Sequence, residues 1–533
     1  MMNRWILVSM ALIIGLSGAS ALVAFASSAS AIATGRVVLQ GGAPASGAWV
    51  RPQTSDNLVY ADSNGEFTLT SLEEGVTVTL TAWYTGHKTG WVEVAPPVSD
   101  ITITLAPYAS GDDPSYEWNT SYPDPANPVL GCGHCMRPSY DEWQHSAHAA
   151  SGSNPRFFSL YNGTDISATF TVTPGYKLDF PGTAGNCAAC HAPGDAYDAP
   201  FTTDMNSLSA IGGEGVFCEY CHKVGNVYLN PTNGLPYNNT PGVLSSRLYR
   251  PFPGEQLFFG SLDDVNRRVS YLPLEQKSQF CAPCHQFSFW GVPIYQSFKE
   301  WLESPYPSMG IECQTCHMPP GESPYFALPE KGGLARNPLR MASHKDLGLK
   351  DLEFMQNTVV MTVTTRLVYE AILVDVAITN TKAGHHVPTD HPGRHLILVV
   401  EALDGDSGAP LTQLSGPQVP SWGGEQAGLP GQAYAKVLQE IASGDFPVVS
   451  YWNPTRILGD NRIPALGSAN SQYTFGAPQF GEAYTITARL ALRRTFQAEM
   501  DRRGWNEPDI PMEEVTVAGE VNYLYTFFPL VAR

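Results

Sequence analysis

The ten cysteines of this 533-residue chain are spaced in a way that could support chemistry. All ten fall into five C-x-x-C pairs, and in four of these pairs a histidine follows directly. Two thiols and an imidazole within five residues make a compact set of attachment points and ligands. The four complete motifs are Cys187, Cys190 and His191; Cys218, Cys221 and His222; Cys281, Cys284 and His285; and Cys313, Cys316 and His317.

The C-x-x-C-H string is the attachment signature of c-type haem. The two thiols can form thioethers with the two vinyl groups of one porphyrin, and the imidazole can bind its iron. Zinc explains the pattern less well, because five pairs leave one unmatched and zinc needs no histidine after four of them. A C-x-x-C disulfide is a small, strained ring and a redox feature, not a structural staple. We therefore interpret the four motifs as heme c sites.

The fifth pair departs from this pattern, because Met136 follows Cys132 and Cys135 in place of histidine. Three interpretations stay open. The pair binds a fifth haem, with Met136 or an external group as axial ligand; it is a degenerate site with a disulfide; or it is a redox dithiol. The last interpretation needs a thioredoxin-like context, and the flanking sequence does not provide one.

A six-coordinate haem takes a second axial ligand from outside its own motif, usually His or Met. Nine histidines are available for this role: His87, His134, His145, His148, His344, His385, His386, His391 and His395.

The run C-x-x-C-M-R-P-S-Y-D-E-W-Q-H-S-A-H-A resembles the opening of the periplasmic multihaem cytochrome c family that includes the nitrifier tetrahaem cytochromes. That family has CxxCH followed by W-x-x-S-x-H-A, and Trp143, Ser146 and His148 match it. The resemblance implies that His148 is the distal ligand of a neighbouring haem. Met136 departs from the family pattern.

Two later strings resemble the same family. The string CHMPP followed by RMASHKDLG implies that His344 binds a second iron. The string NTKAGHHVPTDHPGRHLIL resembles a GHxxPTG stretch in the family's C-terminal β-domain, and His385 matches its histidine. Either neighbour, His145 or His386, could replace the matched histidine as ligand. We expect His391 and His395 to be structural or surface residues.

His148, His344 and His385 are three candidate distal ligands for four haems, so one distal position is left without a histidine. Either a methionine fills it, with Met341 and Met355 available, or one iron is five-coordinate. An open iron could bind a small ligand and do chemistry.

Outside the cysteine motifs, the composition and the strand patterns of the chain predict a multidomain protein. Residues 1–33 read as a signal peptide, with Arg4 before an apolar run. Residues 34–108 predict a small all-β sandwich that resembles the carboxypeptidase regulatory-like module, and 109–128 form a polar linker. Residues 129–350 predict a mainly α or irregular multihaem domain, and 351–533 predict a β-sandwich-like, β-rich domain.

The composition limits the possible partners. Hydrophobic residues make up 43% of the chain, which excludes general disorder. The net charge of −19 argues against nucleic acid and against an anionic membrane surface, and it favours redox protein partners with a basic docking face. After signal cleavage we expect no stable membrane span.

The sequence thus predicts an exported, periplasmic or extracellular, multihaem c-type cytochrome that carries electrons. The alternative is a multihaem oxidoreductase that acts on a small nitrogen or sulfur compound at a five-coordinate haem. The absence of CxxCK, the signature of pentahaem nitrite reductases, argues against this alternative. A structural or adhesive surface protein that stores charge is a third class.

Overall fold

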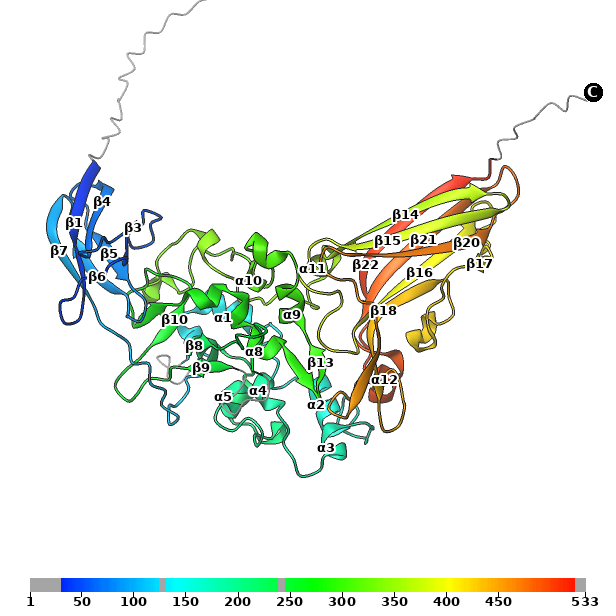
Figure 1. Cartoon of the computed structure of the whole chain (residues 1–533), viewed down its shortest axis with the longest axis horizontal. Helices are drawn as coiled ribbons and strands as arrows, with labels where there is room; N and C mark the ends of the chain where they lie inside the picture. The colour runs from blue at the N-terminus through cyan, green and yellow to red at the C-terminus, as the bar shows by residue number, and fades with distance from the viewer. Residues whose placement is uncertain (1–29, 124–130, 238–244, 523–533) are drawn as a thin grey trace, which may run out of the picture.

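The computed structural model of the chain describes residues 30–123, 131–237 and 245–522. Two β-rich parts flank a central region of short helices and loops (Figure 1). Residues 1–29, which hold most of the expected signal peptide, lie outside the described residues.

The N-terminal part, here the N-terminal sandwich, consists of two sheets that share one core. One sheet has the order β4-β1-β7 and the other β3-β2-β5-β6. In β4 alternating residues point inward, as Phe67 and Leu69 do, so this strand has one apolar face. The strands are β1 (Ser30–Leu39), β2 (Trp49–Pro52), β3 (Val59–Tyr60), β4 (Glu66–Glu73), β5 (Val78–Trp83), β6 (Gly90–Val94) and β7 (Val98–Leu105).

The sandwich starts at Ser30, before the expected boundary at residue 34. Ala31 and Ala33 are buried, and β1 pairs with β4 from Ser30 onward. Residues 30–33 are therefore part of the strand in the folded chain.

Buried ion pairs hold the N-terminal sandwich against the central region. The Arg51 guanidinium lies 2.9 Å from the Asp263 carboxylate. Asp264, which is fully buried, accepts hydrogen bonds from the Thr54 backbone N–H at 2.7 Å and from Arg336. These contacts join two parts of the chain that are about two hundred residues apart, so the sandwich has a fixed docking face.

The segment expected to be a polar linker packs closely on the central region over its described part, residues 109–123. Asn119 donates its backbone N–H to the buried carboxylate of Glu219, and the Tyr116 hydroxyl donates to the same side chain. Asp112 pairs with the buried Arg250 at 2.7 Å. Most of this stretch is thus ordered by polar contacts that its composition did not reveal.

The central region contains only short elements, as expected for a mainly α or irregular domain. Its longest helix, α2, has eight residues. The helices are η1 (Cys132–His134), α1 (Arg137–Trp143), α2 (Pro155–Asn162), α3 (Tyr176–Asp179), α4 (Ala188–His191), α5 (Pro193–Ala196), η2 (Met205–Ser207), α6 (Ala210–Gly213), α7 (Cys218–Cys221), η3 (Pro273–Gln276), η4 (Ser278–Phe280), α8 (Ala282–His285), α9 (Ser297–Leu302), η5 (Tyr306–Met309), α10 (Cys313–His317), η6 (Pro329–Lys331) and η7 (Pro338–Arg340). Three two-stranded sheets are formed by β8 (Val224–Val227) with β9 (Ser246–Leu248), β10 (Phe258–Gly260) with β11 (Val269–Tyr271), and β12 (Phe287–Phe289) with β13 (Val292–Tyr295).

The C-terminal part, here the C-terminal sandwich, also has two sheets around one core. Their orders are β14-β15-β20-β17 and β19-β18-β16-β21-β22. In β15 every second residue is buried, including Val374 and Val376, which produces the apolar inner face. The elements are α11 (Leu352–Gln356), β14 (Val359–Val368), β15 (Ala371–Asn380), β16 (His395–Asp404), β17 (Gln413–Ser415), η8 (Ser421–Gln426), β18 (Gly431–Glu440), β19 (Thr455–Asp460), β20 (Ser468–Gly476), β21 (Ala483–Arg493), α12 (Gln497–Arg503) and β22 (Ile510–Glu520).

One end of the C-terminal sandwich is fixed to the central region by buried cations. The fully buried Arg503 donates to the Ser159 carbonyl oxygen at 2.7 Å. Lys436 Nζ donates to the carbonyl oxygens of Pro293 and Ile294, each at 3.1 Å. The loops at this end therefore face the cysteine-bearing helices.

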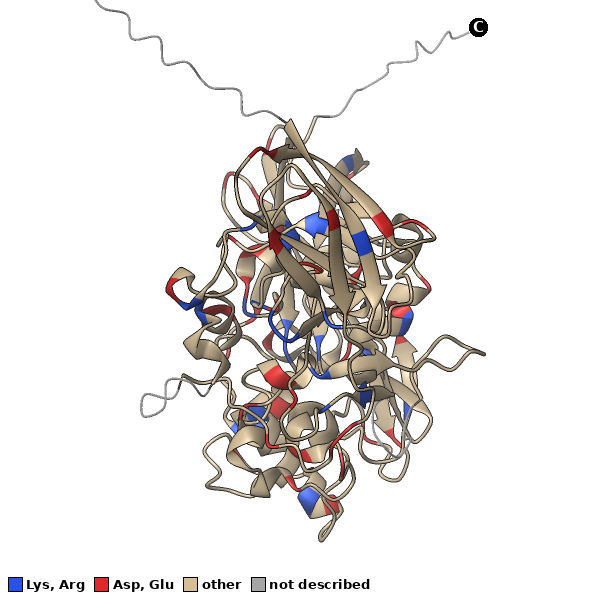
Figure 2. Ribbon diagram, turned by 90° about the vertical axis from the view of Figure 1, so that its left-hand side faces the viewer, with Lys and Arg blue, Asp and Glu red and all other residues tan. Residues whose placement is uncertain are grey.

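Lys and Arg positions and Asp and Glu positions are both scattered over the ribbon (Figure 2). Across residues 30–123, 131–237 and 245–522, no helix has both the length and the apolar character needed to cross a membrane.

Candidate haem-binding site

A single large cavity lies among the cysteine motifs. Its volume is about 1810 Å³, well above the roughly 300–1,000 Å³ of a pocket for one small ligand. All ten cysteines carry free thiols. Eight of them line the cavity: Cys132, Cys135, Cys187, Cys190, Cys218, Cys221, Cys281 and Cys284.

Each complete motif forms one helical turn, which places both thiols and the imidazole on a short rigid unit. In the last motif, Glu312 caps α10 with its side chain, and the Thr315 hydroxyl accepts from the Glu312 N–H at 3.2 Å. This reciprocal capping stabilises a helix that is too short to form alone.

The histidine of each motif uses its Nδ1 atom to contact an oxygen acceptor. A neutral imidazole that donates from Nδ1 leaves Nε2 free to bind a metal. The acceptors are the Ser151 carbonyl for His191 at 3.2 Å, the Phe259 carbonyl for His222 at 2.8 Å, Asp390 for His285 at 3.2 Å and the Leu347 carbonyl for His317 at 2.7 Å.

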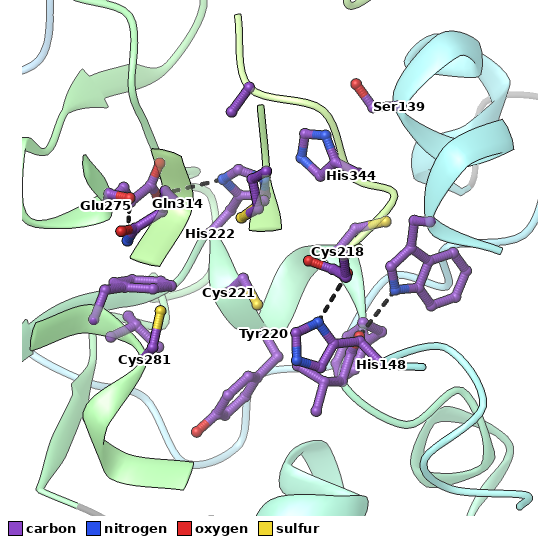
Figure 3. A pocket seen from close by; sticks show the side chains of 18 of the residues that line it. Ser139, His148, Cys218, Tyr220, Cys221, His222, Glu275, Cys281, Gln314 and His344 are labelled. Atoms are coloured by element: carbon purple, nitrogen blue, oxygen red, sulfur yellow. Dashed lines mark hydrogen bonds and ion pairs between the residues drawn. The ribbon is translucent and has the colours of Figure 1, made fainter. Parts of the chain in front are cut away.

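Three of these imidazoles each lie opposite a second imidazole from elsewhere in the chain. The ring centroids are 6.4 Å apart for His222 and His344, 6.4 Å for His285 and His148, and 6.2 Å for His317 and His385. Figure 3 shows the first pair, with the thiols of Cys218 and Cys221 nearby.

These separations fit an iron between two trans imidazoles. A metal–imidazole bond is about 2 Å long and the ring centroid lies roughly 1.1 Å behind the nitrogen, so two trans rings have centroids about 6.2 Å apart. Two of the opposite rings are also oriented by acceptors, since His148 Nδ1 lies 2.8 Å from Asp346 and His385 Nδ1 lies 2.8 Å from the His386 carbonyl oxygen. The residues present therefore fit haem iron.

The geometry distinguishes the matched histidines from their neighbours. His145 is exposed, whereas His148 lines the cavity. His386 lies 3.7 Å from Glu300, and its preceding neighbour His385 is opposite His317. Met341 lines the cavity.

The pair of His285 and His148 differs from the other two pairs because each of its two rings contacts a carboxylate, Asp390 on His285 and Asp346 on His148. Asp390 contacts His285 and also accepts from the Ser297 hydroxyl at 2.6 Å. Burial would lower the pKa of His285, but the hydrogen bond and charge of Asp390 raise it to about 9. Burial would raise the pKa of Asp390, but its contacts with His285 and Ser297 hold it well below the ordinary value.

Unlike the other three motif histidines, His191 has no second imidazole opposite its ring among the residues that the structure describes. Its ring stacks on Phe157 with centroids 4.0 Å apart, and burial lowers its pKa to about 4. The charge of His191 acts on His391, which lines the same cavity. His391, which we expect to be structural or on the surface, is partly exposed and lines the cavity. His395 is fully buried within β16 and stacks on Phe496, as a structural residue would.

Contacts between thiols give the spatial order of the motifs. Thiols of different motifs lie close enough to interact, Cys132 with Cys218, Cys190 with Cys284, and Cys281 with Cys313. The Cys281 motif thus touches the motifs of both Cys187 and Cys313, and Cys221 is close enough to influence Cys281 electrostatically. It is the branch point of the five motifs.

The incomplete motif belongs to the same arrangement. Cys132 and Cys135 line the cavity, and the Leu328 N–H donates to the Cys135 carbonyl at 2.8 Å. Met136, at the start of α1, is 40% exposed. The structure contains neither a disulfide here nor an imidazole in the position that follows Cys135.

Comparisons with known proteins agree with this geometry. Residues 131–223 match the family model of cytochrome c554 and c-prime. The crystal structure of a penta-heme cytochrome c552 from Thermochromatium tepidum is similar with a TM-score of 0.52 at 22% identity, covering 73% of this chain and 97% of that chain. The matched residues include the Cys132, Cys187 and Cys218 pairs, and the structural similarity indicates a shared fold.

The alignment with the PapD-like domain 7 of human CEP192 covers 32% of this chain and 89% of that domain at 10% identity, and its TM-score of 0.14 indicates no shared fold. A search of curated proteins found no match.

Some residues of the candidate haem site could not be predicted from the sequence. Asp346 carries no motif signal, and its role depends on a contact with His148 from a distant loop. Asp390 lies within the GHxxPTG-like stretch, but the resemblance assigns it no role. A carboxylate near a ligand motif is the one signal that could have suggested either residue.

Proposed function

We propose that this chain is an exported multihaem cytochrome c that relays single electrons through four haems attached at its complete C-x-x-C-H motifs. The observation that carries the proposal is the set of three opposed imidazole pairs at 6.2–6.4 Å. When bound, haem iron supplies a one-electron redox couple. The chain attaches each porphyrin through two thiols, orients the axial imidazoles through their Nδ1 atoms and surrounds the group with apolar side chains.

A fifth haem at Cys132 and Cys135 extends this relay. Both thiols are free and line the shared cavity, and Cys132 contacts Cys218 of the next motif. The similar solved structure is described as penta-heme. An iron at this position takes its axial ligands from groups other than a motif histidine.

The order of motif contacts gives the proposed route. The Cys281 site connects the site of Cys187 with that of Cys313, and the Cys218 site leads to Cys132. Electrons therefore enter and leave at the outer sites and pass through the branch point. The net charge of −19 favours donors and acceptors with a basic face, so association weakens as salt is added.

The mass of the intact mature protein tests the proposal, because it counts covalent haems and locates signal cleavage. Five haems are expected, and a reductive titration should bleach all of them. A Cys132→Ala, Cys135→Ala variant should lose one haem. Four haems in both proteins would contradict the fifth site, and a protein without Soret absorbance would contradict the whole proposal.

A second candidate function follows from the missing partner of His191. If no imidazole binds opposite His191, its iron is five-coordinate and open to a small molecule, as an oxidoreductase requires. The EPR spectrum of the oxidised protein tests this candidate. A high-spin ferric signal that His191→Ala removes or alters supports it, and a spectrum with only low-spin signals overturns it.

A further inference from the structure

Around the face of the cavity near His191, loops of the C-terminal sandwich meet helix α2. His391 and Arg394 come from the loop before β16, Tyr451 from the loop between β18 and β19, and Arg494 directly follows β21. Arg156 comes from α2. All five line the same cavity as His191, together with Trp505.

Tyr451 places this group beside the Cys187 motif. Burial raises the pKa of Tyr451, and the charges of Cys187 and Cys190 raise it further. Its hydroxyl lies 3.0 Å from the Tyr295 hydroxyl, and its ring centroid lies 5.8 Å from that of His391. The phenol therefore stays protonated and fixed at the edge of the pocket.

The pocket has an excess of positive charge. Burial lowers the pKa of Arg156 and of Arg494, Glu507 opposes the shift, and the charge of Arg394 lowers both further. The three guanidinium groups are thus close enough to repel one another. Glu507 pairs with Arg156 at 3.4 Å, whereas the nearby Asp390 is already hydrogen-bonded to His285.

Two donors in this pocket have no acceptor in the described part of the chain. Trp505 Nε1 is buried without a partner, and its side chain is only 4% exposed. Arg494 Nε is also buried and unpartnered, while its Nη2 donates to the Leu349 carbonyl at 3.2 Å. The Glu507 Oε2 atom is a buried acceptor without a partner. Leaving such donors unsatisfied is costly, so an acceptor is expected between them.

His391 is arranged as a donor rather than as an iron ligand. Its Nδ1 accepts from the Gly393 N–H at 3.2 Å, so in the neutral ring the proton is on Nε2. His148, His385 and the four motif histidines have the reverse arrangement, because their Nδ1 atoms contact oxygen acceptors. Burial, together with the charges of Arg394 and Arg156, lowers the pKa of His391 to about 3, which keeps the ring neutral.

We propose that this pocket, formed by Arg394, Arg156, Arg494, His391, Tyr451 and Trp505, binds a small oxyanion next to the open side of the haem held by His191. A carboxylate or a nitrite-like anion supplies the negative charge and the acceptor atoms that the arginines and the indole lack. The proposal rests on the open coordination of that iron, which is the second candidate above. A haem propionate is the other source of the same chemistry, and the test separates the two.

The test titrates the oxidised, full-length holoprotein with nitrite and follows the high-spin EPR signal and the Soret band. Imidazole, a neutral ligand for iron, serves as a parallel probe. The variants are Arg394→Gln and Arg494→Gln. The matched control is Arg489→Gln, because Arg489 is a half-exposed residue of β21 that pairs with Glu401 and Glu514.

We expect each pocket variant to weaken nitrite binding on the order of tenfold or more, since it removes a charge-assisted hydrogen bond. Imidazole binding, the haem count and the control should stay unchanged. Equal nitrite affinity in Arg394→Gln and wild type would overturn the proposal. So would a wild-type protein that has the high-spin signal and binds imidazole but not nitrite, because the arginines would then serve a propionate.

A spectrum without any high-spin signal would overturn both the pocket and the open-iron candidate. The relay is read separately in the same samples by the number of haems and their reductive titration. Failure of the oxyanion pocket therefore remains distinguishable from failure of electron transfer.

Discussion

Asp390 of the C-terminal part contacts His285 of the central region, with 3.2 Å between the carboxylate and Nδ1. Asp390 follows β15 in a loop that also carries His385 and His391. One loop of the C-terminal sandwich thus supplies a residue to each of three motif histidines.

The contact between Asp390 and His285 predicts a shift in redox potential. A carboxylate on Nδ1 makes the imidazole more basic and stabilises ferric iron. Asp390→Asn should therefore raise the midpoint potential of one haem by an amount of the order of 59 mV, which corresponds to a tenfold bias for one electron. Spectroelectrochemical titration measures it. The control is Asp375→Asn, because Asp375 lies on the outer face of β15 and contacts Gln472. Equal midpoint potentials in the wild type, Asp390→Asn and Asp375→Asn would contradict the role of Asp390.

The opposed pair of His317 and His385 predicts a change of spin state. Removing one trans ligand leaves the iron five-coordinate, so His385→Ala should convert one haem equivalent from low-spin to high-spin without changing the mass of bound haem. Quantitative EPR of the ferric protein measures the conversion. His386→Ala is the matched control because His386 is the adjacent imidazole and faces Glu300 at 3.7 Å. A high-spin gain in the control instead of in His385→Ala would show that the ligand is His386.

The buried pair of Asp264 and Arg336 predicts a large loss of stability at the N-terminal docking face. Removing one member of a buried ion pair leaves a charge without compensation, and Asp264→Ala should cost about 3–5 kcal/mol. The variant should also become sensitive to protease near residues 105–123. Thermal unfolding and limited proteolysis measure both effects. The exposed pair of Arg36 and Glu66, 3.3 Å apart, offers the control Glu66→Ala, which should cost about 1 kcal/mol or less.

Glu312 predicts a dependence of stability on acid. Burial would raise its pKa, but hydrogen bonds from Ser278 and Lys277 lower it below the ordinary value. A carboxyl with a depressed folded pKa stabilises the fold above its unfolded pKa of about 4.3, and that contribution is lost as the pH falls. Glu312→Gln should therefore unfold at a lower temperature at pH 6 and show a smaller further decrease by pH 3 than the wild type. In contrast, Glu322→Gln should follow the wild type, because Glu322 is exposed.

The sequence was most informative where a motif is local. The C-x-x-C-H strings predict thiols and proximal histidines within one helical turn, and alternating residues such as those of β15 predict the sandwich strands. The resemblance also indicated His148, His344 and His385, each of which lies opposite a motif histidine in the structure.

The pairing of these residues depends on the folded chain and could not be predicted. His148 lies opposite His285 because the turn after α1 and the helix α8 meet across the cavity, and no local pattern encodes that contact. The role of His391 was missed for the same reason. Its burial comes from Arg394, Arg156 and Tyr451, which three separate segments bring together.

The loop between β15 and β16 imposes an order on biogenesis. His385, which lies opposite His317, is synthesised after all five cysteine pairs. The thiols are therefore accessible to attachment chemistry before the C-terminal sandwich is complete, and docking of that sandwich then places His385 opposite His317.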